Sequence, residues 1–105
     1  MDDVLILIND TSTKDPNGIY HKNETRRQVM CQINSITRQE FFSAGRNGLN
    51  PEMEFTIFAG DYLGERTVEY HGNGYGIYRT YIVPGTDYIE LYVERKGGTN
   101  ETDSY

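Results

Sequence analysis

The chain contains one cysteine, no tryptophan and two histidines among its 105 residues. The lone Cys31 cannot form an internal disulfide, so the sequence implies no oxidising compartment. His21 and His71 do not stand at metal-ligand spacing, and Cys31 is far from both in sequence. We therefore expect no metal and no cofactor, and we predict that both histidines lie in exposed loops.

Long apolar runs and clustered positive charge are also missing. No run approaches the roughly 18–20 apolar residues of a membrane-spanning helix, so no membrane partner is expected. The segment Met1–Ile8 begins with acidic residues where a signal peptide is basic, which predicts a protein made in the cytoplasm. Ten Lys and Arg face sixteen Asp and Glu, a formal net charge of −6. Tight nucleic-acid binding needs clustered cations, so that class is disfavoured.

Core-forming side chains are few, since Leu, Ile, Val and Phe together number 23. Their share lies just above the level of about 20% below which disorder is the default. Nine tyrosines partly compensate, because their rings bury large apolar areas. The length predicts one small domain with a thin core, spanning residues 1–96. Gly97–Tyr105 is polar and without periodicity, and we predict that it is a flexible tail.

Alternation of apolar and polar residues predicts β-strands along most of the chain. In one segment Val29, Cys31 and Ile33 point to one face, and Met30 and Gln32 to the other. Strands are predicted, by alternation or by strand-forming composition, at residues 4–8, 26–33, 53–59, 66–70, 75–83 and 89–94. The fold class is therefore mainly β: a small antiparallel β-barrel of about five to six strands with one short helix or loop insertion.

Turn-forming residues separate the predicted strands. Asn9–Gly18 is rich in Asn, Asp and Thr, and it is predicted to be a polar loop. The segment His71-Gly72-Asn73-Gly74 contains Asn-Gly, the strongest short hairpin signal, and predicts a tight turn. Asp61–Glu65 and Pro84–Asp87 predict two further turns.

One helix is predicted, between the second and third strands. Thr37 and Glu40 stand at the N-cap and N3 positions of a capping box, which predicts a helix start. The helix continues through Ala44, and Gly45 or Gly48 would end it.

No group of residues predicts catalysis. Cys31 lies on the apolar face of a strand, where a cysteine is usually an inert core residue. Ser35 and Ser43 lack the sequence context of an activated nucleophile. The sequence places none of the carboxylate pairs across a sugar-binding cleft, and the alternating Glu90 and Glu94 are typical of a solvated strand face. The Gly-rich segment 72–76 precedes a strand instead of a helix, so it predicts a hairpin and not a phosphate-binding loop.

Tyrosines gather in the last third of the chain, at positions 70, 75, 78, 81, 88 and 92. Bases can stack on such rings in oligonucleotide-binding barrels, but those barrels interleave them with several cations. Here Arg79 is the only interleaved cation, while Glu69, Glu90 and Glu94 lie nearby. We predict that one set of rings fills the core and that the other meets a protein partner.

The order of several short motifs carries a resemblance. Arg38-Gln39-Glu40-Phe41-Phe42 is followed by a loop rich in Asn and Gly, and then by Phe55-Thr56-Ile57. Later come Asp61-Tyr62 with Glu65, the hairpin segment Tyr75–Tyr81, and Ile89-Glu90-Leu91 before Arg95 and Lys96. In this order the chain resembles the head-closure family of tailed bacteriophages, also called head–tail adaptor, head-completion or stopper proteins. The resemblance covers residues 28–96, matches residues 1–23 less well, and has no counterpart for the tail.

The resemblance implies a small β-barrel that assembles as a ring in the virion neck. The ring, a dodecamer or alternatively a hexamer, would sit below the portal and adaptor proteins and above a tail-completion or tail protein. It would retain the packaged DNA without sequence-specific binding and provide the tail attachment surface. The resemblance implies no catalysis and no cofactor. Assembly in the host cytoplasm and a final place at the head–tail interface of the virion follow from it.

In the family, a central loop can project into the DNA channel and close it. By position, the candidate segment in this chain is Ser43, Ala44, Gly45, Arg46, Asn47, Gly48, Leu49, Asn50 and Pro51, and an ordinary surface connection is the alternative. Tyr78, Arg79 and Tyr81 are assigned to barrel packing or subunit contacts. Two other functions stay open. One is a tail-terminator or tail-completion protein, and the other is a small β-barrel module that binds peptide or single-stranded nucleic acid.

Overall fold

The computed structural model describes residues 3–95, so the predicted tail Gly97–Tyr105 lies outside the described residues. Within this range six antiparallel strands form one sheet in the order β1-β2-β3-β6-β5-β4, and β4 pairs with β1 to close the ring. This confirms the predicted small antiparallel barrel with one helix. The elements are β1 (Asp3–Lys14), β2 (Tyr20–Asn34), α1 (Arg38–Arg46), β3 (Pro51–Phe58), the 3-10 turn η1 (Ala59–Asp61), β4 (Thr67–Tyr70), β5 (Asn73–Ile82) and β6 (Tyr88–Arg95).

The core lies inside the ring and follows the predicted alternation. Every second residue of β6 is buried, at Ile89, Leu91 and Val93, and the same holds for Val29 and Cys31 of β2. These residues form a single cluster with Leu5, Leu7, Phe55, Ile57, Val68 and Tyr75. Burial raises the pKa of the Cys31 thiol to about 11, so it stays protonated at neutral pH, as its predicted place in the core requires.

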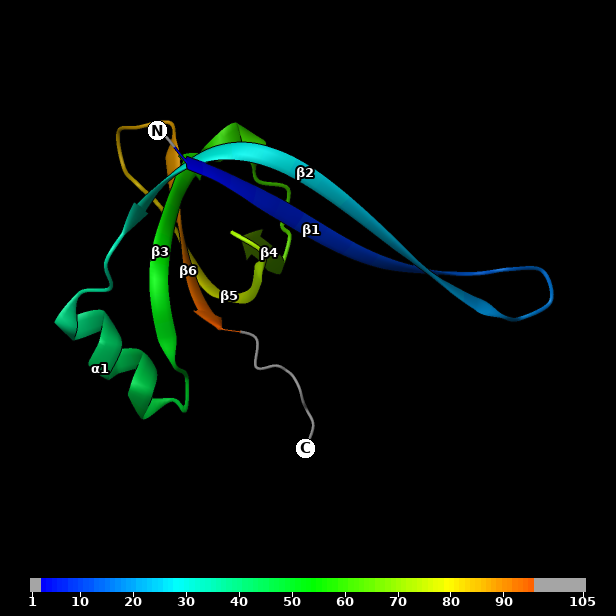
Figure 1. Ribbon diagram of the computed structural model, residues 1–105, viewed down its shortest axis with the longest axis horizontal. Coiled ribbons are helices and arrows are strands. Elements are labelled where there is room, and N and C mark those ends of the chain that lie inside the picture. Colours follow the sequence, from blue (N-terminus) through cyan, green and yellow to red (C-terminus); the bar gives the residue numbers. More distant parts are fainter. Residues whose placement is uncertain (1–2, 96–105) are drawn as a thin grey trace.

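The segment predicted as a polar loop at residues 9–18 is mostly strand. β1 continues to Lys14 and pairs in unbroken register with β2, which begins at Tyr20. We call residues 9–25 the arm. It consists of the paired ends of β1 and β2 and the turn between them, and it projects away from the ring (Figure 1). The Asp15 carboxylate accepts hydrogen bonds from the backbone N–H groups of Asn17 and Ile19, both at 2.9 Å, and this fixes the turn. The loop prediction was wrong because both faces of the arm are exposed, so its strands carry no apolar alternation.

The prediction for the histidines needs correction, whereas the hairpin predicted at residues 71–74 is confirmed. His21 lies in β2, where its Nε2 is 2.8 Å from the Asp15 carboxylate, and only His71 is in a turn. The tight turn between β4 and β5 is His71-Gly72, with φ angles of 50° and 80°, while Asn73 already pairs with Tyr70. Positive φ at both central residues is typical of a type I′ hairpin turn. The His71 ring stacks on the Tyr70 ring at a centroid distance of 3.9 Å, which favours histidine in this unusual conformation.

An ion pair near the base of the arm anchors the turn that precedes β4. Arg27 pairs in register with the buried Leu7, and its guanidinium lies 2.6 Å from the Glu65 carboxylate, which is 3% exposed. Arg27 also donates to the Asp61 carbonyl oxygen at 2.6 Å, and the Leu63 N–H donates to Glu65 at 2.9 Å. Burial alone would raise the Glu65 pKa, but the hydrogen bonds from Arg27 and Leu63 outweigh it and lower the pKa. The predicted turn at 61–65 is thus anchored immediately before β4.

We expect Arg27→Ala to destabilise the fold by about 2 kcal/mol, because Glu65 would remain buried without its partner. Urea denaturation followed by circular dichroism measures this loss. The matched control is Arg26→Ala, which removes an arginine whose pairs with Glu24 and Glu69 are more exposed, so its loss is smaller. Adding Glu65→Gln to Arg27→Ala should recover part of the stability. Equal losses for the two arginine variants would contradict the role assigned to Arg27.

Candidate functional site

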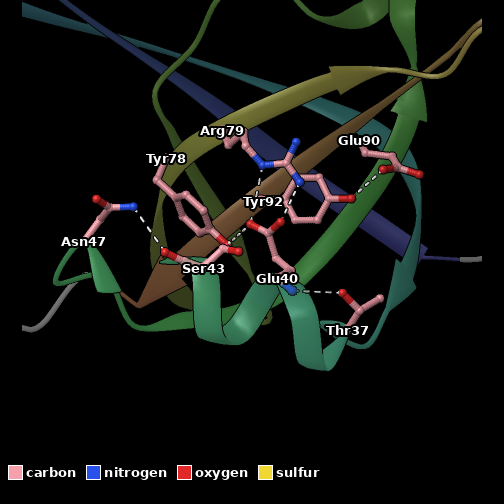
Figure 2. Close-up of polar contacts among 8 residues, drawn as sticks. All are labelled: Thr37, Glu40, Ser43, Asn47, Tyr78, Arg79, Glu90 and Tyr92. Atoms are coloured by element: carbon pink, nitrogen blue, oxygen red, sulfur yellow. Dashed lines mark hydrogen bonds and ion pairs between the residues drawn. The ribbon is translucent and has the colours of Figure 1, made fainter. Parts of the chain in front are cut away.

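The helix α1 lies outside the ring, next to β3, and a single carboxylate attaches it to β5 (Figures 1 and 2). The Thr37 hydroxyl accepts the Glu40 backbone N–H at 3.1 Å, as the predicted N-cap requires. The Glu40 side chain points to β5, where it accepts hydrogen bonds from the Tyr78 hydroxyl at 2.8 Å and from Arg79 at 2.6 Å. The capping prediction thus placed the helix start correctly, and the contact of Glu40 with β5 is new.

A β-bulge in β5 brings Tyr78 and Arg79 to the same side of the strand. The register between β5 and β6 shifts after the pair Ile77 and Val93, so that Arg79 lies opposite Tyr92 and Tyr78 is the additional residue. Neighbouring residues of a regular strand would point to opposite faces. The bulge removes that alternation locally, and both side chains can therefore reach Glu40.

A row of polar and aromatic side chains continues from Arg79 across the outer face of the sheet. The register joins Arg79 to Tyr92, Tyr92 to Glu54, and Glu54 to Asn34. The Arg79 guanidinium lies over the Tyr92 ring at 4.0 Å from its centroid. Burial and a hydrogen bond to Glu90, at 2.6 Å, raise the pKa of Tyr92 to about 12.

Glu54 is buried, although it lies on the face of β3 opposite the core residues Phe55 and Ile57. It is 6% exposed and accepts hydrogen bonds from Asn34 at 2.9 Å and from Thr56 at 2.6 Å. Desolvation raises its pKa more than these hydrogen bonds lower it. The alternation predicted the correct face, but the packing of α1 against β3 depends on tertiary structure.

The predicted channel segment, Ser43–Pro51, divides into three parts. Ser43 to Arg46 form the last turn of α1, Asn47 is its C-cap, and Pro51 is the first residue of β3. The connection itself is therefore Asn47–Asn50, which corrects the longer loop predicted for these residues. Gly48 follows the C-cap with a φ of 79°, so Gly48 and not Gly45 ends the helix.

The sequence assigned Tyr78, Arg79 and Tyr81 to barrel packing or subunit contacts. The structure brings the predicted channel segment close to the first two of them. A shallow cavity of about 210 Å³ lies between α1 and β5; Glu40, Tyr78 and Arg79 line it together with Ser43, Ala44, Asn47 and Leu49. Figure 2 shows Tyr78 and Arg79 pointing to the helix, with Ser43 and Asn47 beside them. Tyr81 lies apart, opposite Glu90, and is 45% exposed.

A second surface, which is apolar and was not predicted from the sequence, crosses the outer face of the sheet at the C-terminal end of β3. Val4 pairs with Met30, and Phe58 pairs with Tyr88, while the pairing of Cys31 with Ile57 places Met30 beside Phe58. We call these four side chains the apolar row: Val4, Met30, Phe58 and Tyr88, which are 37%, 49%, 47% and 42% exposed. Each residue belongs to a different strand, so the row becomes recognisable only once the register is known.

The described residues form neither a recognisable metal site nor a membrane-spanning helix. Among residues 3–95, no group of three His, Cys, Asp or Glu side chains could hold a metal ion. No helix in the same range is long and apolar enough to cross a membrane. A cavity of about 430 Å³ lies where the arm leaves the ring; it is lined by Ile8, Asn9, Asp10, Gly64, Arg66 and Thr67.

Comparison with known proteins adds no relative. No family model matches the chain, and no curated protein sequence matches it. A functional assignment therefore depends on the motifs of the chain and on the geometry described above.

We expect Glu40→Gln to lower stability by about 1 kcal/mol near neutral pH, because it weakens the contacts with Tyr78 and Arg79. Burial alone would raise the Glu40 pKa, but the hydrogen bonds from Arg79 and Tyr78 lower it overall. Because the Glu40 pKa is lower in the folded state, the ionised carboxylate stabilises the folded protein above pH 4.5, the ordinary glutamate value. This stabilisation is lost as the pH falls through the folded-state pKa.

The difference in stability between wild type and Glu40→Gln should therefore shrink between neutral pH and about pH 3, measured by urea denaturation at each pH. Glu52→Gln is the matched control, since Glu52 is an exposed carboxylate of β3 with no ion pair within residues 3–95. A difference that stays constant with pH would show that the ionised Glu40 does not hold the helix.

Proposed function

We propose that this chain is a head-closure component of a tailed-bacteriophage neck. In this role it forms a ring below the portal and adaptor proteins, retains packaged DNA and provides a surface for tail attachment. The basis is the resemblance of residues 28–96 to that family. A closed six-stranded sheet with a helix between β2 and β3 supports the proposal, because the resemblance implies a small barrel with such an insertion.

The observation that carries the proposal is the contact between the two halves of the resemblance. The element Arg38–Phe42 forms the first turns of α1, and the element Tyr75–Tyr81 lies in β5. Glu40 from the first element binds Tyr78 and Arg79 from the second. Two short motifs that are distant in sequence thus form one structural unit, and that unit positions the connection Asn47–Asn50.

Exposed surface supports assembly into a ring. A two-stranded hairpin such as the arm is at best marginally stable by itself in water. The apolar row crosses four strands, and contiguous apolar surface of this kind often marks an interaction site. A subunit that buries both features against neighbours gains stability that the isolated domain lacks.

The charge balance suits a passage for DNA. A conduit lined by cations would bind phosphates at every step of DNA movement, whereas this chain has a formal net charge of −6. The connection Asn47–Asn50 has no charged residue, and it is the part of the predicted segment that is free of helix and strand. We assign the channel-closing role to this connection.

Deleting the gene from the phage or prophage that encodes it should give heads that package DNA and then leak it, together with free, complete tails. Cryo-electron microscopy of the particles from such an infection or induction distinguishes the alternatives. Filled, stable heads with overlong or defective tails would instead indicate a tail-terminator or tail-completion protein. Normal infectious particles would reject the virion role and favour a peptide-binding or nucleic-acid-binding module.

Lysine in the connection should retard DNA movement if this segment lines the channel. We expect Asn47→Lys with Asn50→Lys to slow DNA ejection from particles, because each added cation binds passing phosphates. Time-resolved dye fluorescence of ejected DNA measures the rate. Asn73→Lys with Thr80→Lys, at exposed positions of β5, adds the same charge elsewhere and is the control. Faster ejection, or equal rates for the two variants, would remove the connection from the channel.

A further inference from the structure

The apolar row and the tip of the arm are two exposed features of one chain that cannot meet within it. Met30 of the row and Tyr20 of the tip lie on the same continuous strand, ten residues apart. Ten residues of extended strand span about 33 Å. The row of a given protomer must therefore be covered by something other than its own arm.

The arm tip carries the large apolar side chains of the arm. Ile19 and Tyr20 are 57% and 69% exposed, and no other exposed side chain of the arm is large and apolar. Tyr20 pairs with Lys14, and Lys22 pairs with Ser12, so these side chains share one face of the arm. The Lys14 ammonium lies 5.7 Å from the centroid of the Tyr20 ring. The tip thus presents one aromatic ring flanked by two cations.

The surroundings of the apolar row have the opposite charge. Asp87 immediately precedes Tyr88, and Glu90 lies two residues further along the same face of β6. Neither carboxylate has an ion-pair partner within the described part of the chain, and the same is true of Lys14 and Lys22. Apolar surface flanked by carboxylates therefore complements apolar surface flanked by ammonium groups.

We propose that the arm tip of one copy of this chain docks on the apolar row of the next copy. Tyr20 packs against Met30 and Phe58, while Lys14 and Lys22 approach Asp87 and Glu90. The row is about 14 Å wide, three strand spacings, which is wide enough for the end of a two-stranded hairpin. The contact joins different surfaces of two identical chains, so it repeats from copy to copy and closes when the rotation allows. This inference rests on the ring that the proposed function requires, and it names the interface.

Cysteine pairs test the docking directly. In purified protein carrying Tyr20→Cys and Met30→Cys, mild oxidation should link copies into a ladder of dimers, trimers and larger species on non-reducing gels. The two new thiols cannot pair within one chain because of the length of strand between them. The native Cys31 is fully buried and contributes no background.

Two controls make the result specific. Tyr20→Cys with Tyr81→Cys keeps an exposed cysteine on the barrel but moves it off the row, so the ladder should be lost. Mixing the single variants Tyr20→Cys and Met30→Cys should stop at the dimer, while each single variant alone should give no linked product. Circular dichroism of every variant confirms folding, since all three positions are exposed.

Each outcome decides the inference separately from the proposed function. A ladder that is absent, or equal in the off-row control, overturns the docking even if phage lacking the protein release leaking heads. A specific ladder supports the docking even if phage lacking the protein are fully infectious, in which case the neck role fails. Linked dimers from Tyr20→Cys alone would indicate a symmetric arm-to-arm contact and would also overturn the inference.

Discussion

Closure of the sheet depends on a short ladder between its first and fourth strands. Only Ile6, Leu7 and Ile8 of β1 pair with β4, opposite Glu69, Val68 and Thr67. β4 itself has four residues, so its position depends on the turn before it, which the ion pair between Arg27 and the buried Glu65 holds. Because β4 begins at Thr67, opposite Ile8, no strand within residues 3–95 pairs with the outer edge of β1 from Asn9 onward, and β1 continues as one side of the arm. The short length of β4 is thus sufficient to close the ring around the core but leaves the arm unpaired with it.

The outer face of the ring is divided between two uses. At one end the polar row of Asn34, Glu54, Tyr92 and Arg79 crosses the sheet, and Glu40 connects α1 to Arg79 at the end of this row. The connection after the helix is also attached at both ends, since the Leu49 N–H donates to the Ala44 carbonyl oxygen and the Asn50 N–H donates to Glu94. At the other end the apolar row has no cover within residues 3–95. Internal contacts thus satisfy the charged end, whereas the apolar end is exposed.

The sequence predicted those parts of the fold where one face of a strand is buried. Alternation found the strands around Cys31, Phe55 and Leu91, because inward side chains must be apolar and outward ones need not be. It failed in the arm, where neither face is buried and threonine and asparagine pair across the strands as readily as they form loops. The Asn-Gly signal correctly located a hairpin at residues 71–74, and the register determines that His71 and Gly72 are its central residues.

The site was less predictable than the fold, for a physical reason. The sequence grouped Tyr78 and Arg79 with Tyr81, but a bulge determines that the first two reach Glu40, and no sequence pattern marks that bulge. The apolar row and the arm tip each require residues from strands that are distant in the chain to be set side by side. For a ring of such subunits, the angle between arm and row would determine how many copies close it. That angle depends on the twist of two strands over residues 9–25 rather than on any single side chain, so ring size is a property of the assembled geometry and cannot be assigned to a motif.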